Sequence, residues 1–180
     1  MVMLMMTDAV SFGVDPANRE QQAALLTAAG LLRAQIPPGC DRIEYNASFL
    51  ANAVHTYASG FTPDGDQVMV TPLFDTNAAF RVLRALMFQS GHGTWFKVRM
   101  TVQTDGTHEE AFNQEHVPDI EPYVDYVTDQ HMFPIDEDKQ PKWLKPRLAL
   151  GVQWLRDHDE RWYPQWLYDM IQAGNKPDWL

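Results

Sequence analysis

The residues of this sequence best suited to chemistry lie between positions 108 and 116. Four side chains there could ligate a metal ion or transfer protons: His108, Glu109, Glu110 and His116. On a β-strand, however, positions 108 and 109 point to opposite faces, so these groups do not converge. The sequence also lacks an HExxH motif, a CxxC motif and a compact His/Asp trio. We therefore expect no metal site, while a small enzyme that uses Glu110 or His108 stays open as an alternative.

The glycine-rich run Gly91-His92-Gly93-Thr94 raises the question of phosphate binding. Phosphate loops end at the N-terminus of a helix, whereas this run leads into a strand pattern and contains no GxxxxGK[ST] motif. The run is more typical of a helix C-cap followed by a flexible link. We expect His92, between two glycines, to be exposed in a contact loop.

The sequence offers no activated nucleophile. Cys40, the single cysteine, has no histidine near it in the sequence and cannot form an internal disulfide. No GxSxG motif is present for a serine nucleophile. A lone cysteine points to a reducing compartment. We expect no catalytic residue and no cofactor.

A basic and aromatic strip is predicted on one strand. In the segment 95–102, Phe96, Val98, Met100 and Val102 would face the core, and Trp95, Lys97, Arg99 and Thr101 would face outward. Such a strip can stack on bases, but the acidic strand that follows it offers cross-strand ion pairs instead. We therefore expect a binding module, without direct nucleic-acid binding.

Negative charge is concentrated in one segment. The net charge is −10, and residues 105–138 contain 11 of the 24 acidic residues and no Lys or Arg. An acidic surface repels nucleic acid and anionic membranes and attracts basic partners. A merely solvated face is the alternative.

Targeting signals are weak. The N-terminus, MVMLMM, is apolar, but no Lys or Arg occurs before residue 19, so the charged region of a secretory signal is missing. No apolar run approaches the roughly 18 residues that a membrane helix needs. We expect a cytoplasmic protein with no membrane partner.

Hydrophobic periodicity predicts an α+β fold with an antiparallel sheet of about five strands packed with helices. Asp15-Pro16 is expected to start a helix with Leu25, Ala29, Leu32 and Ile36 on one face. The apolar stripe of the second helix is expected to be Ala79, Val82, Leu83, Leu86 and Met87. The predicted elements are helix 17–36, strands 41–49, 53–61 and 67–71, helix 75–91, strands 95–102 and 107–113, helix 119–132, and two further helical patterns towards residue 180.

The C-terminal residues form a tryptophan-rich extension. We expect an α+β domain over 1–153 and a helical extension over 154–180 that packs on it. The extension carries Trp154, Trp162, Trp166 and Trp179, whose large side chains are costly to expose. The alternative is that this apolar surface is itself the face that binds a partner.

The order of several motifs resembles the YezG-like immunity (antitoxin) family of bacterial polymorphic toxin systems, over residues 30–144. The matching pieces are IPPGCDRIEY, TPDGD, MVTP, FRVLRALMFQSGHGTWFKVRMTV, TDG, FNQEHVP and YVDYVTDQHMFPIDEDKQPKWL, in this order. The combination of GxGTWF, FN and a later FPxDxxxxPxWL is the more specific part.

The resemblance implies an immunity protein that binds a cognate toxin domain, either a nuclease or an NAD-cleaving enzyme, and blocks its active site. A nuclease site is basic and an NAD site holds a pyrophosphate, so a carboxylate-rich surface suits both. An acidic regulatory scaffold that mimics nucleic acid stays open as an alternative. The expected toxin-binding residues are His92, Trp95, Glu109, Glu110, Glu115, Asp119, Glu121, Asp125 and Asp129.

Overall fold

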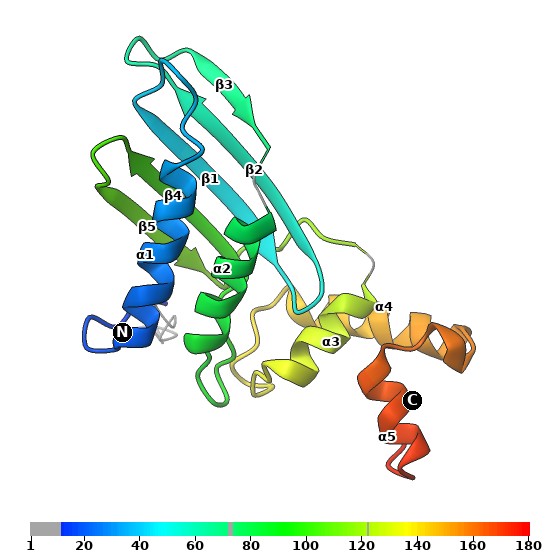
Figure 1. Cartoon of the computed structure of the whole chain (residues 1–180). Helices are drawn as coiled ribbons and strands as arrows, with labels where there is room; N and C mark the ends of the chain where they lie inside the picture. The colour runs from blue at the N-terminus through cyan, green and yellow to red at the C-terminus, as the bar shows by residue number, and fades with distance from the viewer. Residues whose placement is uncertain (1–11, 72–73, 122) are drawn as a thin grey trace, which may run out of the picture.

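The computed structural model describes residues 12–71, 74–121 and 123–180. The N-terminal stretch MVMLMM, which was considered above as a targeting signal, lies outside these ranges, as do Pro72 and Pro122. A five-stranded antiparallel sheet carries two helices on one face, and further helices pack beside one end of it (Figure 1). The elements are α1 (Arg19–Arg33), β1 (Arg42–Phe49), β2 (Val54–Phe61), β3 (Gln67–Val70), α2 (Phe74–Leu86), β4 (Lys97–Gln103), β5 (His108–Asn113), α3 (Val124–Met132), α4 (Leu144–Asp157), the 3-10 helix η1 (Glu160–Trp162) and α5 (Gln165–Gln172).

The predicted α+β class with an antiparallel sheet is confirmed. The strand order is β3-β2-β1-β4-β5, and every neighbouring pair is antiparallel. Tyr45 at the centre of β1 lies opposite Ala58 on β2 and Met100 on β4. The connection through α2 therefore places β4 beside β1, so the first strand becomes the central one.

Alternating apolar residues along β1 and β4 build the core. Ile43, Tyr45, Ala47 and Phe49 on β1 are buried together with Val98, Met100 and Val102 on β4. The buried side of α1 covers this face with Leu25, Ala28, Ala29 and Leu32. Figure 1 shows α1 and α2 lying side by side on this face.

The apolar stripe predicted for α2 is partly wrong. The side chain of Val82 is 55 % exposed, and the buried positions are Thr76, Phe80, Leu83 and Arg84. The ring of Phe80 stacks on Tyr45 at 4.8 Å, which rotates α2 so that position 82 faces solvent. Two residues along a helix correspond to about 200° of rotation, so Phe80 and Val82 cannot both face the sheet.

Helix boundaries also differ from expectation. α1 begins at Arg19, because the side chain of Asn18 caps it by accepting hydrogen bonds from the backbone N–H groups of Glu20 and Gln21. Asp15 instead holds the preceding turn by accepting from the N–H of Ala17 at 2.8 Å. α2 ends at Leu86, and α3 begins only at Val124.

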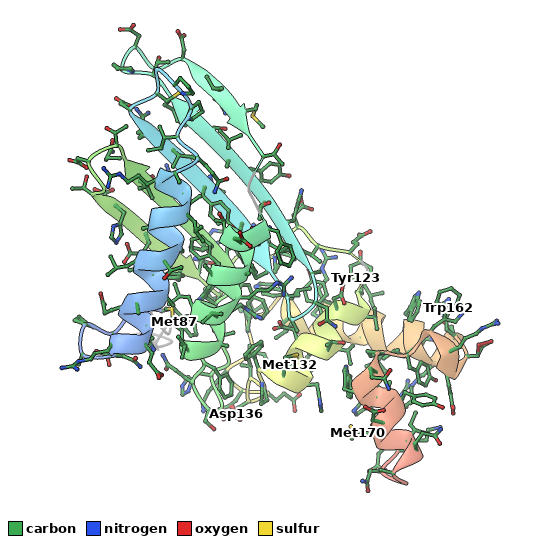
Figure 2. All side chains as sticks on the ribbon, in the orientation of Figure 1. Met87, Tyr123, Met132, Asp136, Trp162 and Met170 are labelled. Carbon is green, nitrogen blue, oxygen red and sulfur yellow. The ribbon has the colours of Figure 1, made fainter. Side chains whose placement is uncertain are left out.

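The C-terminal helices pack on α3. Leu155 and Leu167 are fully buried against Val127, and the indole N–H of Trp166 donates to the hydroxyl of Thr128 at 3.1 Å. Trp154 and Trp179 pack against the same cluster. The predicted boundary after residue 153 falls inside α4, which is continuous. Trp162 lies beyond the end of α4 (Figure 2). Its side chain is 59 % exposed.

Gly151 explains how closely α4 approaches α3. A Cβ atom at this position would lie 2.6 Å from the carbonyl oxygen of Tyr123 and 2.6 Å from a methyl group of Val127. Because Gly151 has no side chain, the backbone of α4 can lie directly against Tyr123 and Val127. None of the helices formed by the described residues has the length and apolar character needed to cross a membrane.

Candidate functional site

The face of the sheet turned away from α1 and α2 is the candidate binding surface. Asn46 on β1, Tyr57 on β2, Arg99 on β4 and Glu109 on β5 all point to this face and are exposed. Because side chains alternate along a strand, the burial of the core residues forces these intervening residues outward. We refer to this face as the open face.

A shallow concavity of about 550 Å³ lies on the open face. Lys97 and Arg99 on β4 contribute to its lining between His55 and Tyr57 on β2 and the chain that follows β5. It is open to solvent, unlike the enclosed, apolar pockets that hold small-molecule substrates. Its shape suits a protruding part of a larger partner.

The segment that follows β5, residues 114–121, borders this concavity and is firmly held. The side-chain amide of buried Gln114 donates to the carbonyl oxygens of His92 at 2.7 Å and Thr94 at 3.1 Å. The hydroxyl of Tyr126 donates to the carbonyls of Pro118 at 3.1 Å and Ile120 at 3.2 Å. Burial raises the pKa of Tyr126 to about 12, so the phenol keeps its proton and remains a donor at neutral pH.

His55 links this segment to the sheet. Its Nδ1 atom lies 3.1 Å from the carbonyl oxygen of Asp119 and 3.5 Å from the Asp119 carboxylate. The imidazole also packs against Tyr57, with ring centroids 4.7 Å apart. The wall of the concavity is therefore ordered before any partner arrives, which lowers the entropy lost on binding.

The floor of the concavity is basic although the protein is acidic. The Arg99 guanidinium lies 3.4 Å from Glu44, and 64 % of its side chain is exposed. Lys97 forms no ion pair with any carboxylate in the part of the chain that the structure describes. Asp119 is the one carboxylate residue among the described residues that line the concavity. His55 and Tyr57 were not among the predicted site residues, although alternation over 53–61 places both of them on one face of a strand.

Four of the predicted binding residues are exposed. Glu109 lies on the open face, and Asp119 lies at the edge of the concavity. Glu115 is exposed on the bordering segment, and Glu121 accepts a hydrogen bond from the hydroxyl of Tyr123 at 3.0 Å. These residues are accessible to a partner.

The outward position predicted for Trp95 is wrong. Its side chain has no exposed surface and meets the ring of Phe49 edge-on at 5.5 Å, with Phe112 on another side. β4 begins only at Lys97, so the strand alternation does not extend back to Trp95, and both Trp95 and Phe96 are buried. Of the residues predicted to face outward, Lys97, Arg99 and Thr101 lie on the open face, and Trp95 does not.

Asp129 and Asp125 do not lie on an acidic surface. Asp129 is 2 % exposed, and both of its carboxylate oxygens accept hydrogen bonds from Arg84. Asp125 is half-buried one turn earlier on α3, and burial together with the charge of Asp129 raises its pKa. The expectation that Asp129 contacts a partner is therefore wrong for this structure, because its charge is neutralised inside the protein.

Glu110 faces the core side of β5, opposite Met100, and not the open face. Its carboxylate lies 3.9 Å from Nε2 of His108, and both side chains are half-buried. Glu109 points to the other side, as the alternation predicts. The four potential ligands between 108 and 116 are thus divided between two faces. No group of three or more His, Cys, Asp or Glu among the described residues could hold a metal ion.

The loop that contains His92 is not the flexible link that its glycines suggest. Gly91 and Gly93 adopt positive φ angles of 74° and 70°, and both form bridges with the segment around Ile135 or with Gln89. The N–H of Asp136 donates to the carbonyl of Gly91 at 2.9 Å. His92 is half-buried, and its carbonyl is held by Gln114. The glycines are required by backbone geometry and close approach, so the prediction of an adaptable contact loop is wrong.

The remaining acids of 105–138 are spread over different surfaces. Asp136 pairs with Lys139 at 2.7 Å, and Glu137 pairs with Lys145 at 2.5 Å. Asp105 lies in the turn between β4 and β5, where hydrogen bonds from Thr107 lower its pKa. The acidic segment is continuous in sequence but does not form one continuous face.

A second, apolar groove of about 340 Å³ lies between α3, α4 and the C-terminus. Val127, Leu148, Val152, Trp166 and Trp179 contribute to its lining. His131 stacks on Trp166 with ring centroids 4.0 Å apart at its edge. This groove therefore lies where the C-terminal extension meets α3 and the first part of α4.

In comparisons with known proteins, no family model and no curated protein matches this chain.

Proposed function

We propose that this protein is an immunity protein: it binds a cognate toxin domain through the open face and blocks the active site of that domain. The observation that carries the proposal is the concavity on the open face, which is wide, ordered and lined with both charged and aromatic side chains. Tyr and Arg are enriched among the residues that contribute most to protein interfaces, and Tyr57 and Arg99 are both exposed here. The ordered motif resemblance to the YezG-like immunity family supports the same function.

Charges at the border of the open face would favour rapid capture. Glu109, Glu115 and Asp119 are exposed around the concavity, within a protein of net charge −10. A basic toxin domain would be attracted by this field and would associate faster than by unbiased diffusion. Speed matters for an inhibitor that must act before the toxin damages the cell that makes it.

The two alternatives have less support. A nucleic-acid mimic needs carboxylates along one continuous face, and the described acids lie on separate surfaces, several of them paired with bases. An enzyme that uses Glu110 or His108 would need that side chain to reach a proton of a bound substrate. Both side chains are half-buried on the core side of β5, where Glu110 lies opposite Met100.

Co-expression with a toxin tests the proposal. The proposal predicts that a toxin domain is encoded beside the gene for this protein. That domain is induced in a bacterial host, alone and together with the protein, and growth is recorded. We expect the protein to restore growth and the purified pair to elute as one complex in size-exclusion chromatography. The proposal fails if growth is not restored and no complex forms. It also fails if the purified protein cleaves NAD or nucleic acid and Glu110→Gln removes that activity.

A matched pair of variants locates the contact. Tyr57→Ala truncates an exposed side chain of the open face, and Tyr168→Ala truncates an exposed tyrosine on α5. If the open face binds the toxin, Tyr57→Ala weakens the complex by about fivefold or more, because truncated interface aromatics can change binding by over 1 kcal/mol. Tyr168→Ala leaves the affinity unchanged. The opposite result would place the binding surface on the C-terminal extension.

A further inference from the structure

We infer that the concavity on the open face receives an acidic side-chain cluster of the partner protein, held between Lys97 and Arg99. This inference rests on the proposed function and adds the chemistry of the partner. It differs from what the composition suggests. A protein of net charge −10 is expected to bind basic surfaces, yet the concavity on its open face is lined by two basic residues, Lys97 and Arg99.

The spacing of the two cations suits a pair of carboxylates. Lys97 and Arg99 are two residues apart on one strand and therefore point to the same face about 7 Å apart. Arg99 contacts Glu44 with one nitrogen at 3.4 Å, so most of its five N–H donors remain available in the described structure. A carboxylate that approaches from solvent can accept from the guanidinium fork without displacing Glu44.

Neutral donors surround the cations. The side-chain oxygen of Asn113 accepts a hydrogen bond from the backbone N–H of His116 at 2.7 Å, so the amide NH2 of Asn113 is left to donate. Asn113 and the exposed Asn46 both help to line the concavity. Amide and guanidinium donors together form a site that prefers an acceptor-only group, which an ionised carboxylate is.

The wider charge distribution favours a protein over nucleic acid. A nucleic-acid backbone carries a regular row of phosphates, and it would pass the exposed carboxylates of Asp119 at the edge of the concavity and of Glu109 further along the open face. Those carboxylates repel an extended polyanion. A folded protein can present acidic side chains at the centre and basic ones at the border, which matches both parts of the surface.

The experiment uses the full-length protein and four probes at low salt. Hexaglutamate, hexaglutamine, a hexathymidylate oligonucleotide and inorganic phosphate are each titrated into the 15N-labelled protein, and amide shifts are followed by NMR. We expect hexaglutamate to produce saturable shifts centred on residues 46, 57, 97 and 99, and hexaglutamine to produce none there. The inference fails if hexaglutamate does not saturate or if its shifts lie elsewhere. It also fails if the oligonucleotide binds more tightly at these residues, or if phosphate at equal concentration reproduces the shifts.

Charge-reversal variants separate this surface from general electrostatics. Lys97→Glu and Arg99→Glu should each weaken hexaglutamate binding by about fivefold or more, because each replaces an attraction with a repulsion at short range. Lys142→Glu makes the same change of net charge at an exposed residue outside the concavity and should have little effect. Equal weakening by all three variants would overturn the inference. The peptide titrations contain no toxin, so their outcome is independent of the co-expression test. If co-expression shows that the toxin is neutralised but hexaglutamate does not bind, this inference fails and the proposed function stands. A peptide that binds without any toxin being neutralised would remove the proposed function alone.

Discussion

Arg84 and Asp129 form a buried bidentate ion pair, with Nη1–Oδ1 and Nη2–Oδ2 distances of 2.7 and 2.9 Å. Each side chain is 3 % exposed. Arg84 also donates from Nε to the carbonyl of Trp95 at 2.8 Å, and its guanidinium lies over the ring of Phe133 at 4.7 Å. The pair therefore joins α2, which covers the sheet, to α3, which carries the C-terminal helices.

Removing either member of this pair should destabilise the protein strongly. We expect Arg84→Ala or Asp129→Ala to lower the free energy of unfolding by about 3–5 kcal/mol, because each leaves a buried charge without a partner. The apolar double variant Arg84→Met/Asp129→Leu should lose less than either single variant. Urea denaturation of the parent and the three variants compares these losses.

The exposed pair Glu137–Lys145 is the matched control, since both side chains are more than 70 % exposed. Lys145→Ala should change the free energy of unfolding by less than about 1 kcal/mol. A similar loss for Lys145→Ala and Arg84→Ala would contradict the role given to burial.

Truncation of Leu167 tests whether the C-terminal helices pack on α3 in solution. Leu167 is fully buried against Val127 and Leu155, so Leu167→Ala should lower the free energy of unfolding by about 2–4 kcal/mol. Tyr168→Ala, at the adjacent exposed position, should stay within about 0.5 kcal/mol of the parent. Denaturation followed by circular dichroism measures both. Equal stability of the parent, Leu167→Ala and Tyr168→Ala would mean that the packing of the extension on α3 does not stabilise the protein.

Two glycines with similar backbone angles should respond differently to alanine. Gly65 has φ of 93° and open space around it, so Gly65→Ala should lower stability by about 1–2 kcal/mol through backbone strain alone. Gly93 has φ of 70°, and a Cβ there would also overlap the side chain of Ile135. Gly93→Ala should therefore lower stability by about 1–3 kcal/mol more than Gly65→Ala. Thermal melts compare the two, and equal losses would show that the contact with Ile135 is absent in solution.

The stability supplied by Tyr126 should depend on pH in the alkaline range. Its pKa is raised by burial from an ordinary value of 10.0 to about 12, so the protonated phenol is the form that favours folding. Its contribution is complete below pH 10 and is lost as the pH rises from about 10 to 12. Tyr126→Phe leaves the carbonyls of Pro118 and Ile120 without this donor and should lower stability by about 1–3 kcal/mol at pH 8.

The difference between parent and Tyr126→Phe should then shrink in urea titrations repeated between pH 10 and 11.5. Burial also raises the pKa of Tyr45, but both proteins keep that residue, so its effect cancels in the comparison. A difference that stays constant with pH would contradict the proposed titration of Tyr126.

The sequence by itself determined the strands and their faces. Alternation over 41–49 and 95–102 assigns Tyr45 and Met100 to the core and Arg99 to the opposite face, and the structure agrees at these positions, although not at Trp95. The turn residues at 62–66 and 104–106 likewise predict the two hairpins. These features depend on side chains a few positions apart, whose relative directions are set by the backbone geometry of a single strand or turn.

The tertiary structure alone decided which charges and aromatic rings reach solvent. Asp129 and Asp119 have the same carboxylate and lie in the same acidic segment, yet one meets Arg84, 45 positions earlier, and the other meets His55, 64 positions earlier. Trp95 and Tyr57 both occur in strand-like patterns, and one is buried while the other is 52 % exposed. Burial depends on which distant segments the topology brings together. The free energy of burying a charged or aromatic side chain depends on those neighbours. Local periodicity carries no information about residues that are distant in the sequence.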